Sequence, residues 1–167
     1  MSDLIKQYRI LHRNNKKYGK SSEKLKDIIQ PFVDELNPSV ILDYGCGKSR
    51  LLESLNTSAK LLRYDPAIRQ YATYPSTPVE FIINTDVLEH IPEEQLDSVL
   101  THISKSSDKV FFCICLAKAV NNLPDGTNCH KTVKPSQWWK EKLNTYFPVI
   151  KEHPYPGGRN AVFTTWT

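Results

Sequence analysis

The stretch "VILDYGCGKSRLLESL", residues 40–55, governs the interpretation of this 167-residue chain. An apolar run at 40–42 leads into a turn with two glycines, and leucines at helical spacing follow directly. A buried strand, a glycine turn and a helix in this order are typical of the first unit of a nucleotide-binding α/β fold. Gly45 and Gly47 have no Cβ, so a ligand can approach the backbone closely there. The stretch therefore predicts a site for a nucleoside cofactor.

The rest of the chain alternates between strand and helix patterns. Strands are predicted at 40–44, 60–64, 80–85, 109–116, 148–153 and 160–166, helices at 48–55, 92–103 and 136–146, and a short helix or turn at 65–72. Such alternation implies right-handed βαβ units and a mostly parallel sheet covered on both faces. We therefore expect an α/β, Rossmann-like, doubly wound fold.

Helical patterns also precede the first strand, at residues 2–12 and 21–36, with the polar loop "NNKKYGKSS" between them. Pro31 lies inside the second pattern, so a kink or break is expected near Gln30. The chain length suits one domain. We expect residues 1–37 to form N-terminal helices or a lid, and residues 38–167 to form the core.

Composition and charge narrow the function classes. Apolar residues make up 40% of the chain and charged residues 24%, as in ordinary soluble proteins. No apolar run approaches the ~18 residues of a membrane span, and the N-terminus has no signal-peptide pattern. A cytoplasmic protein without membrane association is expected.

The net charge of +4 is concentrated near the N-terminus. The basic cluster comprises Lys6, Arg9, His12, Arg13, Lys16, Lys17 and Lys20. It could meet nucleic acid or a phosphorylated substrate, but a solvated helix face is the favoured interpretation. Nucleic acid is therefore not the expected partner, although the cluster leaves it open.

The four cysteines do not suggest a disulfide framework. Cys113 and Cys115 alternate within an apolar run and are expected to be small buried residues of a strand. Cys129 and His130 are possible zinc ligands, but no paired C-x-x-C spacing accompanies them. We therefore expect no metal.

Acidic residues fall at the ends of three predicted strands: Asp43, Asp65 and Asp86. Ligands of open α/β sheets bind beyond the carboxyl ends of the strands. Asp65 follows the glycine turn by ~20 residues, where an acid accepts hydrogen bonds from a ribose diol. Two alternatives remain: Asp43 could cap the following helix, and Asp65 before Pro66 could open a turn.

The segments "LDYGCGKSRLLESL", "RYDPA" and "FIINTDVLEHIPEEQLDSVL" together resemble class I methyltransferases that use S-adenosylmethionine, in particular the group around the ubiquinone-biosynthesis O-methyltransferases. "KKYGKSS" and "LPDGTNCHKTVKPSQWW" are similar to small methyltransferases of bacteriophages and prophages. The resemblance spans residues 8–153 and implies S-adenosylmethionine as cofactor, with S-adenosylhomocysteine as product.

The chain departs from the family at two places. Ser49 stands where the family has a third glycine. Residues 66–79 are too few for a helix and a third strand, and they include no acid for the adenine amino group. We expect the third strand to be shortened or missing, with adenine held by backbone and by residues near Asp86.

The resemblance implies a set of cofactor-binding residues: Tyr18, Asp43, Gly45, Cys46, Gly47, Asp65, Pro66, Asp86 and Val87. Asp43 would orient the methionine amino group, and Asp65 would hold the ribose hydroxyls. Asp86 and Val87 would border the adenine and the sulfonium. Tyr18 would close over the methionine end from the N-terminal loop.

A candidate for catalysis is His130, in the polar loop after the strand at 109–116. It would act as general base toward an acceptor hydroxyl or orient the acceptor. A solvated loop histidine is the alternative. Glu89 and His90 are expected to be structural surface residues rather than catalytic ones.

The expected function is methyl transfer from S-adenosylmethionine to a small-molecule or sugar-like acceptor, at oxygen. The alternatives are a non-catalytic cofactor-binding or partner-binding protein on the same fold, and an RNA or protein methyltransferase. A nicotinamide-dependent oxidoreductase is disfavoured, because Arg50 occupies the last position of the G-x-G-x-x-G pattern.

Overall fold

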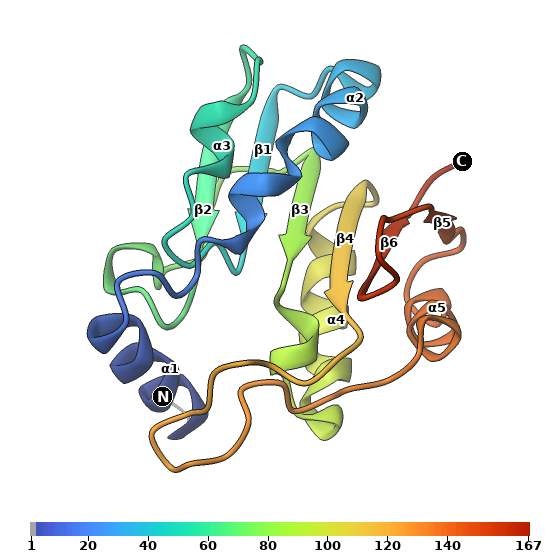
Figure 1. Ribbon diagram of the computed structural model, residues 1–167. Helices are drawn as coiled ribbons and strands as arrows, with labels where there is room; N and C mark the ends of the chain where they lie inside the picture. The colour runs from blue at the N-terminus through green and yellow to red at the C-terminus, as the bar shows by residue number, and fades with distance from the viewer. Residues whose placement is uncertain (1–2) are drawn as a thin grey trace.

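The strand predicted at the start of the quoted stretch is β1 (Val40–Tyr44), which lies inside a six-stranded sheet in the computed structural model (Figure 1). The structure describes residues 3–167. The other strands are β2 (Lys60–Tyr64), β3 (Phe81–Thr85), β4 (Val110–Cys115), β5 (Lys151–His153) and β6 (Asn160–Thr164). Their order is β2-β1-β3-β4-β6-β5. The first four run parallel and β6 is antiparallel to both its neighbours, which confirms the Rossmann-like prediction.

The helices are α1 (Asp3–Asn14), α2 (Lys26–Leu36), α3 (Leu51–Ser54), α4 (Glu93–Ser106) and α5 (Ser136–Asn144). Short 3-10 turns, η1 (Ser21–Leu25), η2 (Arg69–Tyr71) and η3 (Leu88–His90), lie between them. The start predicted for the first helix, at residue 2, lies outside the described residues. No helix within residues 3–167 has the length and apolarity to cross a bilayer.

Two predicted helices differ from the structure. The helix expected at 48–55 is a single turn, α3, because the glycine turn extends to Arg50. Of the kink or break expected near Gln30, the break is not found, since α2 continues through Pro31. Buried Ile29 and Val33 hold the helix against the sheet on both sides of the proline, and the change of helix type falls at Leu25 instead.

Alternate residues of the strands point to opposite faces of the sheet and belong to two separate apolar cores. Leu42 of β1 belongs to a core completed by α4 and α5, whereas its neighbour Ile41 belongs to a core completed by α2 and α3. Both faces of the sheet are therefore covered, as parallel strands require. This packing fixes the strands and so fixes the positions of the turns at their carboxyl ends.

The sheet ends at β2, and within the described residues no strand lies between β2 and β3 in the chain. Residues 65–80 contain only the 3-10 turn η2 and irregular backbone. The third strand expected to be shortened or missing is therefore missing.

Candidate functional site

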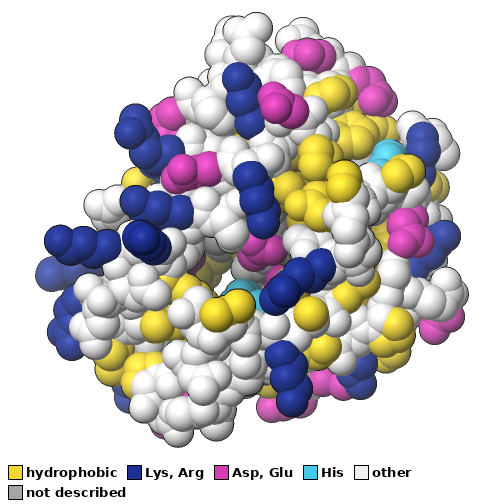
Figure 2. Space-filling view, viewed as in Figure 1, with side chains coloured by type: hydrophobic (Ala, Val, Ile, Leu, Met, Phe, Trp, Pro, Cys, Tyr) yellow, Lys and Arg dark blue, Asp and Glu magenta, His cyan; other side chains and the backbone are white. Residues whose placement is uncertain are grey.

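Beyond the carboxyl ends of the parallel strands, α1 and the loop 117–135 lie side by side (Figure 1). The hydroxyl of Tyr8, on α1, donates to the backbone oxygen of Cys129 at 2.6 Å. The side chain of Gln7 hydrogen-bonds Asp125 at 2.8 Å, so helix and loop are joined. In the space-filling view the surface is hollowed here, with histidine and acidic side chains at the edge (Figure 2). Segments far apart in sequence thus enclose one polar space.

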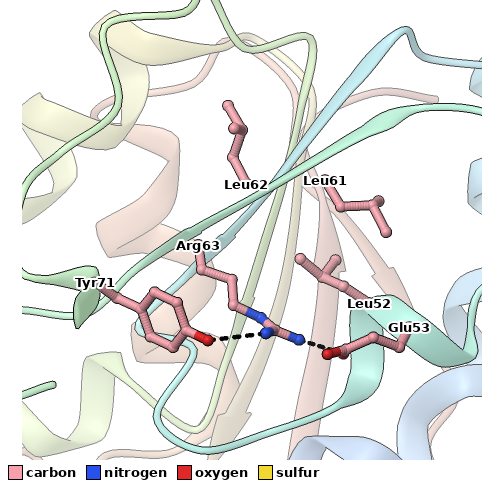
Figure 3. A pocket seen from close by; sticks show the side chains of 6 residues that line it. All are labelled: Leu52, Glu53, Leu61, Leu62, Arg63 and Tyr71. Atoms are coloured by element: carbon pink, nitrogen blue, oxygen red, sulfur yellow. Dashed lines mark hydrogen bonds and ion pairs between the residues drawn. The ribbon is translucent and has the colours of Figure 1, made fainter.

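A separate shallow pocket lies along the open edge of β2 (Figure 3). Arg63 projects across it, donating to the hydroxyl of Tyr71 at 3.0 Å and pairing with Glu53. Leu61 of β2 and Leu52 of α3 lie beside one another in its lining, and Leu62 points to the other side of the strand. This pocket stands where a third strand would continue the sheet, so we interpret it as a consequence of the missing strand.

The glycine turn after β1 has a conformation that requires glycine. The φ angles of Gly45 and Gly47 are +83° and +52°, in the left-handed region. A Cβ on Gly45 would lie 2.3 Å from Cγ2 of Val87, and one on Gly47 would lie 2.9 Å from the oxygen of Gly19. The amides of Gly45 and Cys46 both donate to the Tyr64 oxygen, at 2.7 and 3.2 Å. The N-terminal loop and the turn after β3 therefore pack directly on this turn.

Asp43 is buried beside the glycine turn, with 1% of its surface exposed. Its Oδ2 has no hydrogen-bond partner among the described residues. Burial raises the pKa of Asp43 to about 7, against the opposing effect of Arg63. It does not cap a helix, because α3 begins after Arg50 without a side-chain cap. A buried carboxyl group with a free oxygen is suited to a cationic ligand group.

Asp65 follows β2 and connects the turn after β1 to the turn after β2 through hydrogen bonds. Its Oδ2 accepts the Gly47 amide and its Oδ1 accepts the Ala67 amide, both at 2.8 Å. It therefore does open the turn at Pro66, and each oxygen retains a lone pair for a ribose hydroxyl. The oxygen of Pro66 accepts a hydrogen bond from Arg9 of α1 at 3.1 Å.

Asp86 and Val87 occupy the turn after β3. Asp86 has a left-handed φ of +54°, and its Oδ2 accepts a hydrogen bond from the Ser21 hydroxyl. Tyr18 lies in the N-terminal loop, with its ring 4.9 Å from that of His12 and 6.4 Å from that of His90. Burial raises the pKa of Tyr18. The sequence-predicted residues are thus distributed over three strand-end turns and the loop that covers them.

The expectation that Glu89 is a surface residue is wrong. Its side chain is fully buried, Oε1 accepts the Cys115 amide at 2.8 Å, and Oε2 has no partner among the described residues. Burial, reinforced by Asp86, raises its pKa to about 8. Glu89 faces inward because η3 places it under the end of β4, and this contact was not evident from the sequence.

His90 and His130 lie together beside Glu89, and the surface role expected for His90 is also wrong. Their ring centroids are 4.6 Å apart. Burial, with His130 nearby, lowers the pKa of His90 to about 3. His130 Nδ1–H donates to the Ala117 oxygen at 2.5 Å. The signal available in the sequence was the pair Glu89-His90 at the end of a strand, where ligands of such folds bind.

The residues at the strand ends fit a ligand that combines a cationic amino group with a ribose. The free oxygen of Asp43 offers a partner for the cation. The Cβ positions of Gly45 and Gly47 face Val87 and the Gly19 backbone, so these two glycines hold the turn in place beside the two acids. Asp65 has remaining acceptor capacity for a diol.

Comparison with known proteins assigns the chain to a family. Residues 15–153 match the family model described as a methyltransferase domain. No curated protein matches the sequence.

Solved structures with a similar fold are also methyltransferases. The methyltransferase domain of bacterial CtHen1 has a TM-score of 0.60 and 16% identity, over 86% of this chain and 98% of that one. DhpI, in a complex with S-adenosylhomocysteine, has a TM-score of 0.60 and 11% identity, over 96% of each chain.

Two further structures come from Burkholderia thailandensis. The 1,6-didemethyltoxoflavin-N1-methyltransferase, with bound 1,6-didemethyltoxoflavin and S-adenosylhomocysteine, has a TM-score of 0.55 and 13% identity, over 88% of this chain and 77% of that one. An O-methyltransferase family protein has a TM-score of 0.53 and 12% identity, over 84% of this chain; the present chain spans 56% of it.

Proposed function

The chain belongs to the methyltransferase domain family and uses S-adenosylmethionine as methyl donor, and we propose that it methylates an oxygen of a small-molecule or sugar-like acceptor. The observation that carries the choice of oxygen is the orientation of His130. Because its Nδ1–H donates to the Ala117 oxygen, Nε2 is the atom left to accept a proton. A hydroxyl acceptor must lose its proton during transfer, and an imidazole is suited to receive it.

The cofactor would lie across the turns at the strand ends. Asp43 would pair with the amino group of the methionine end, the turn Gly45-Cys46-Gly47 would lie under it, and Asp65 beside Pro66 would hold the ribose hydroxyls. Asp86 and Val87 would border the adenine and the sulfonium. Tyr18 would cover the methionine end, supported by its position in the loop packed on the glycine turn.

The bound cofactor supplies a methyl group already activated by a sulfonium. The acceptor oxygen would take this methyl group as the carbon–sulfur bond breaks, with S-adenosylhomocysteine as the product. The hydroxyl proton would pass to Nε2 of His130 and then to solvent. Alignment of the oxygen, carbon and sulfur supplies much of the rate, so the chain contributes mainly by holding both substrates in position.

An RNA acceptor is a second candidate, favoured by the basic cluster of α1 and its following loop. Arg9 of this cluster reaches Pro66 beside the proposed ribose site. Lysine and arginine side chains gather on one side of the hollow (Figure 2). We also propose that the chain belongs with the small bacteriophage methyltransferases, on the "KKYGKSS" and "LPDGTNCHKTVKPSQWW" segments.

The test is an acceptor screen with radiolabelled S-adenosylmethionine, in which hydroxylated metabolites, nucleosides, short RNAs and proteins are separate arms. His130→Ala should lower turnover of the true acceptor about 100-fold or more, while S-adenosylhomocysteine affinity measured by calorimetry stays within about 2-fold of wild type. Methylation at nitrogen, or turnover unchanged in His130→Ala, would contradict the proposal. Cofactor binding without turnover in any arm would favour a non-catalytic binding protein.

A further inference from the structure

Glu89, His90 and His130 form a cluster that the proposed cofactor contacts do not explain. One potential ligand atom from each residue lies within 4.8 Å of the others. The residues come from η3 and from the loop 117–135, about 40 positions further along the chain. We propose that this cluster binds one divalent transition-metal ion, with the Glu89 carboxylate and both imidazoles as ligands.

The Glu89 carboxylate is the first support. It is fully buried, and Oε1 is used by the Cys115 amide while Oε2 has no partner among residues 3–167. A buried carboxylate oxygen without a partner is costly, because nothing replaces the water that it loses. A cation between Glu89 and the two imidazoles provides the missing partner and compensates the charge.

The orientation of the two rings is the second, independent support. His130 Nδ1–H donates to the Ala117 oxygen at 2.5 Å. His90 Nδ1 lies 3.2 Å from the Cys129 oxygen and 3.1 Å from the Tyr8 hydroxyl, which itself donates to Cys129. A carbonyl oxygen only accepts, so both rings carry their proton on Nδ1 and leave Nε2 as a lone pair. Metal-binding histidines characteristically donate the other ring nitrogen to a backbone oxygen in this way.

The ligand set indicates the kind of ion. Two imidazoles and one carboxylate suit zinc, cobalt, iron or manganese, whereas magnesium and calcium prefer oxygen ligands throughout. Bonds of about 2.1 Å place ligand atoms roughly 3 to 4 Å apart, so the cluster needs only a small contraction to close on an ion. Three protein ligands leave positions open for water or substrate, as in catalytic rather than structural sites.

The metal site would change how the acceptor is activated. An ion held by Nε2 of His130 would coordinate the acceptor hydroxyl and make its proton easier to lose. His130 would then act through the ion rather than as a free base. This role rests on the proposed function, but the binding of the ion does not. The zinc pair considered from the sequence, Cys129 and His130, differs, because Cys129 contributes its backbone oxygen to orienting His90 instead.

The test uses the full chain after chelator treatment, titrated calorimetrically with Zn²⁺ and Mn²⁺ and by visible absorption with Co²⁺. We expect one equivalent of Co²⁺ and Zn²⁺ to bind, at least about 10-fold more tightly than Mg²⁺. His130→Ala and Glu89→Gln should each weaken binding at least about 10-fold. Gln at position 89 retains an oxygen for the Cys115 amide, so its fold is expected to survive, and circular dichroism checks this.

His153→Ala, which removes an imidazole on β5, should leave the metal affinity unchanged. No binding by the wild type, or binding that persists in His130→Ala and Glu89→Gln, would overturn the proposal. Titration of the same samples with S-adenosylhomocysteine distinguishes a failure of the metal-site proposal from a failure of the proposed function. Cofactor binding without metal binding would refute the metal site alone, and metal binding without cofactor binding would refute the proposed function alone.

Discussion

Gly45 and Val87 touch across the carboxyl edge of the sheet: a Cβ on Gly45 would lie 2.3 Å from Cγ2 of Val87. The first residue belongs to the turn after β1 and the second to the turn after β3, so the two turns proposed to hold the cofactor support one another. The contact makes glycine necessary at position 45 for two reasons, its φ of +83° and the space occupied by Val87.

The two reasons can be separated with a matched glycine. Gly126 has a φ of +85° and no atom within 4 Å of a Cβ, so Gly126→Ala reports the backbone strain alone, about 1 kcal/mol. Gly45→Ala should destabilise the protein by about 1 to 3 kcal/mol more, because of the added overlap. Urea unfolding measures both variants. Combining Gly45→Ala with Val87→Ala should recover most of the excess, and equal costs for the two alanine variants would refute the contact.

Asp65→Ala should abolish cofactor binding and lower stability. The change removes the acceptor of the Gly47 and Ala67 amides, and each lost hydrogen bond to a charged group costs about 1.5 to 3 kcal/mol. Calorimetry with S-adenosylhomocysteine and urea unfolding measure the two effects. Asp34→Ala, which removes an exposed acid of α2, is the control and should change neither. Retained cofactor affinity in Asp65→Ala would exclude the ribose role.

The raised pKa of Asp43 predicts a pH dependence of stability. Its pKa is about 7 in the folded protein against an ordinary value of 3.8. Between these values the folded state holds the proton more often than the unfolded state, so stability falls as pH rises from about 4 to 7. Glu89, with a pKa of about 8, contributes in the same direction. Asp43→Asn should therefore reduce the slope without removing it; an unchanged slope between pH 4 and 7 would contradict the assignment.

Cofactor affinity should show the opposite trend with pH. A cationic amino group binds the ionised form of Asp43, so S-adenosylhomocysteine should bind more tightly at pH 8 than at pH 6. Calorimetry at the two pH values tests this. The trend should be weaker in Asp43→Asn, and an identical trend in that variant would show that another group is responsible.

Tyr8→Phe should loosen α1 from the loop 117–135. The hydroxyl donates to the Cys129 oxygen at 2.6 Å and lies 3.1 Å from Nδ1 of His90, so its loss leaves both groups without that partner. We expect a loss of about 1 to 2 kcal/mol in stability and faster hydrogen exchange in α1. Lys6→Ala, on the same helix but with its side chain paired to Asp3 of α1, is the control and should have little effect. Equal exchange rates in the two variants would argue against this role of Tyr8.

The strands and the absence of a third strand after β2 were predictable from the sequence. The runs at 40–44 and 60–64 match β1 and β2, and the shortness of 66–79 predicted the missing strand. The length of α3 and the continuity of α2 through Pro31 were not predictable in the same way. Both depend on packing against the sheet, and local helix propensity does not include the effect of such tertiary contacts.

By itself, the sequence determined the α/β class, the glycine turn and the acids at the strand ends, because these follow from periodicity and from residues close together in the chain. Only the tertiary structure decided that Glu89 is buried and that His90 and His130 meet beside it. It also decided that Tyr8 orients this cluster from the far end of the chain. The physical reason is that burial and side-chain convergence arise when distant segments fold onto the same sheet edge, and local residue patterns do not specify that meeting.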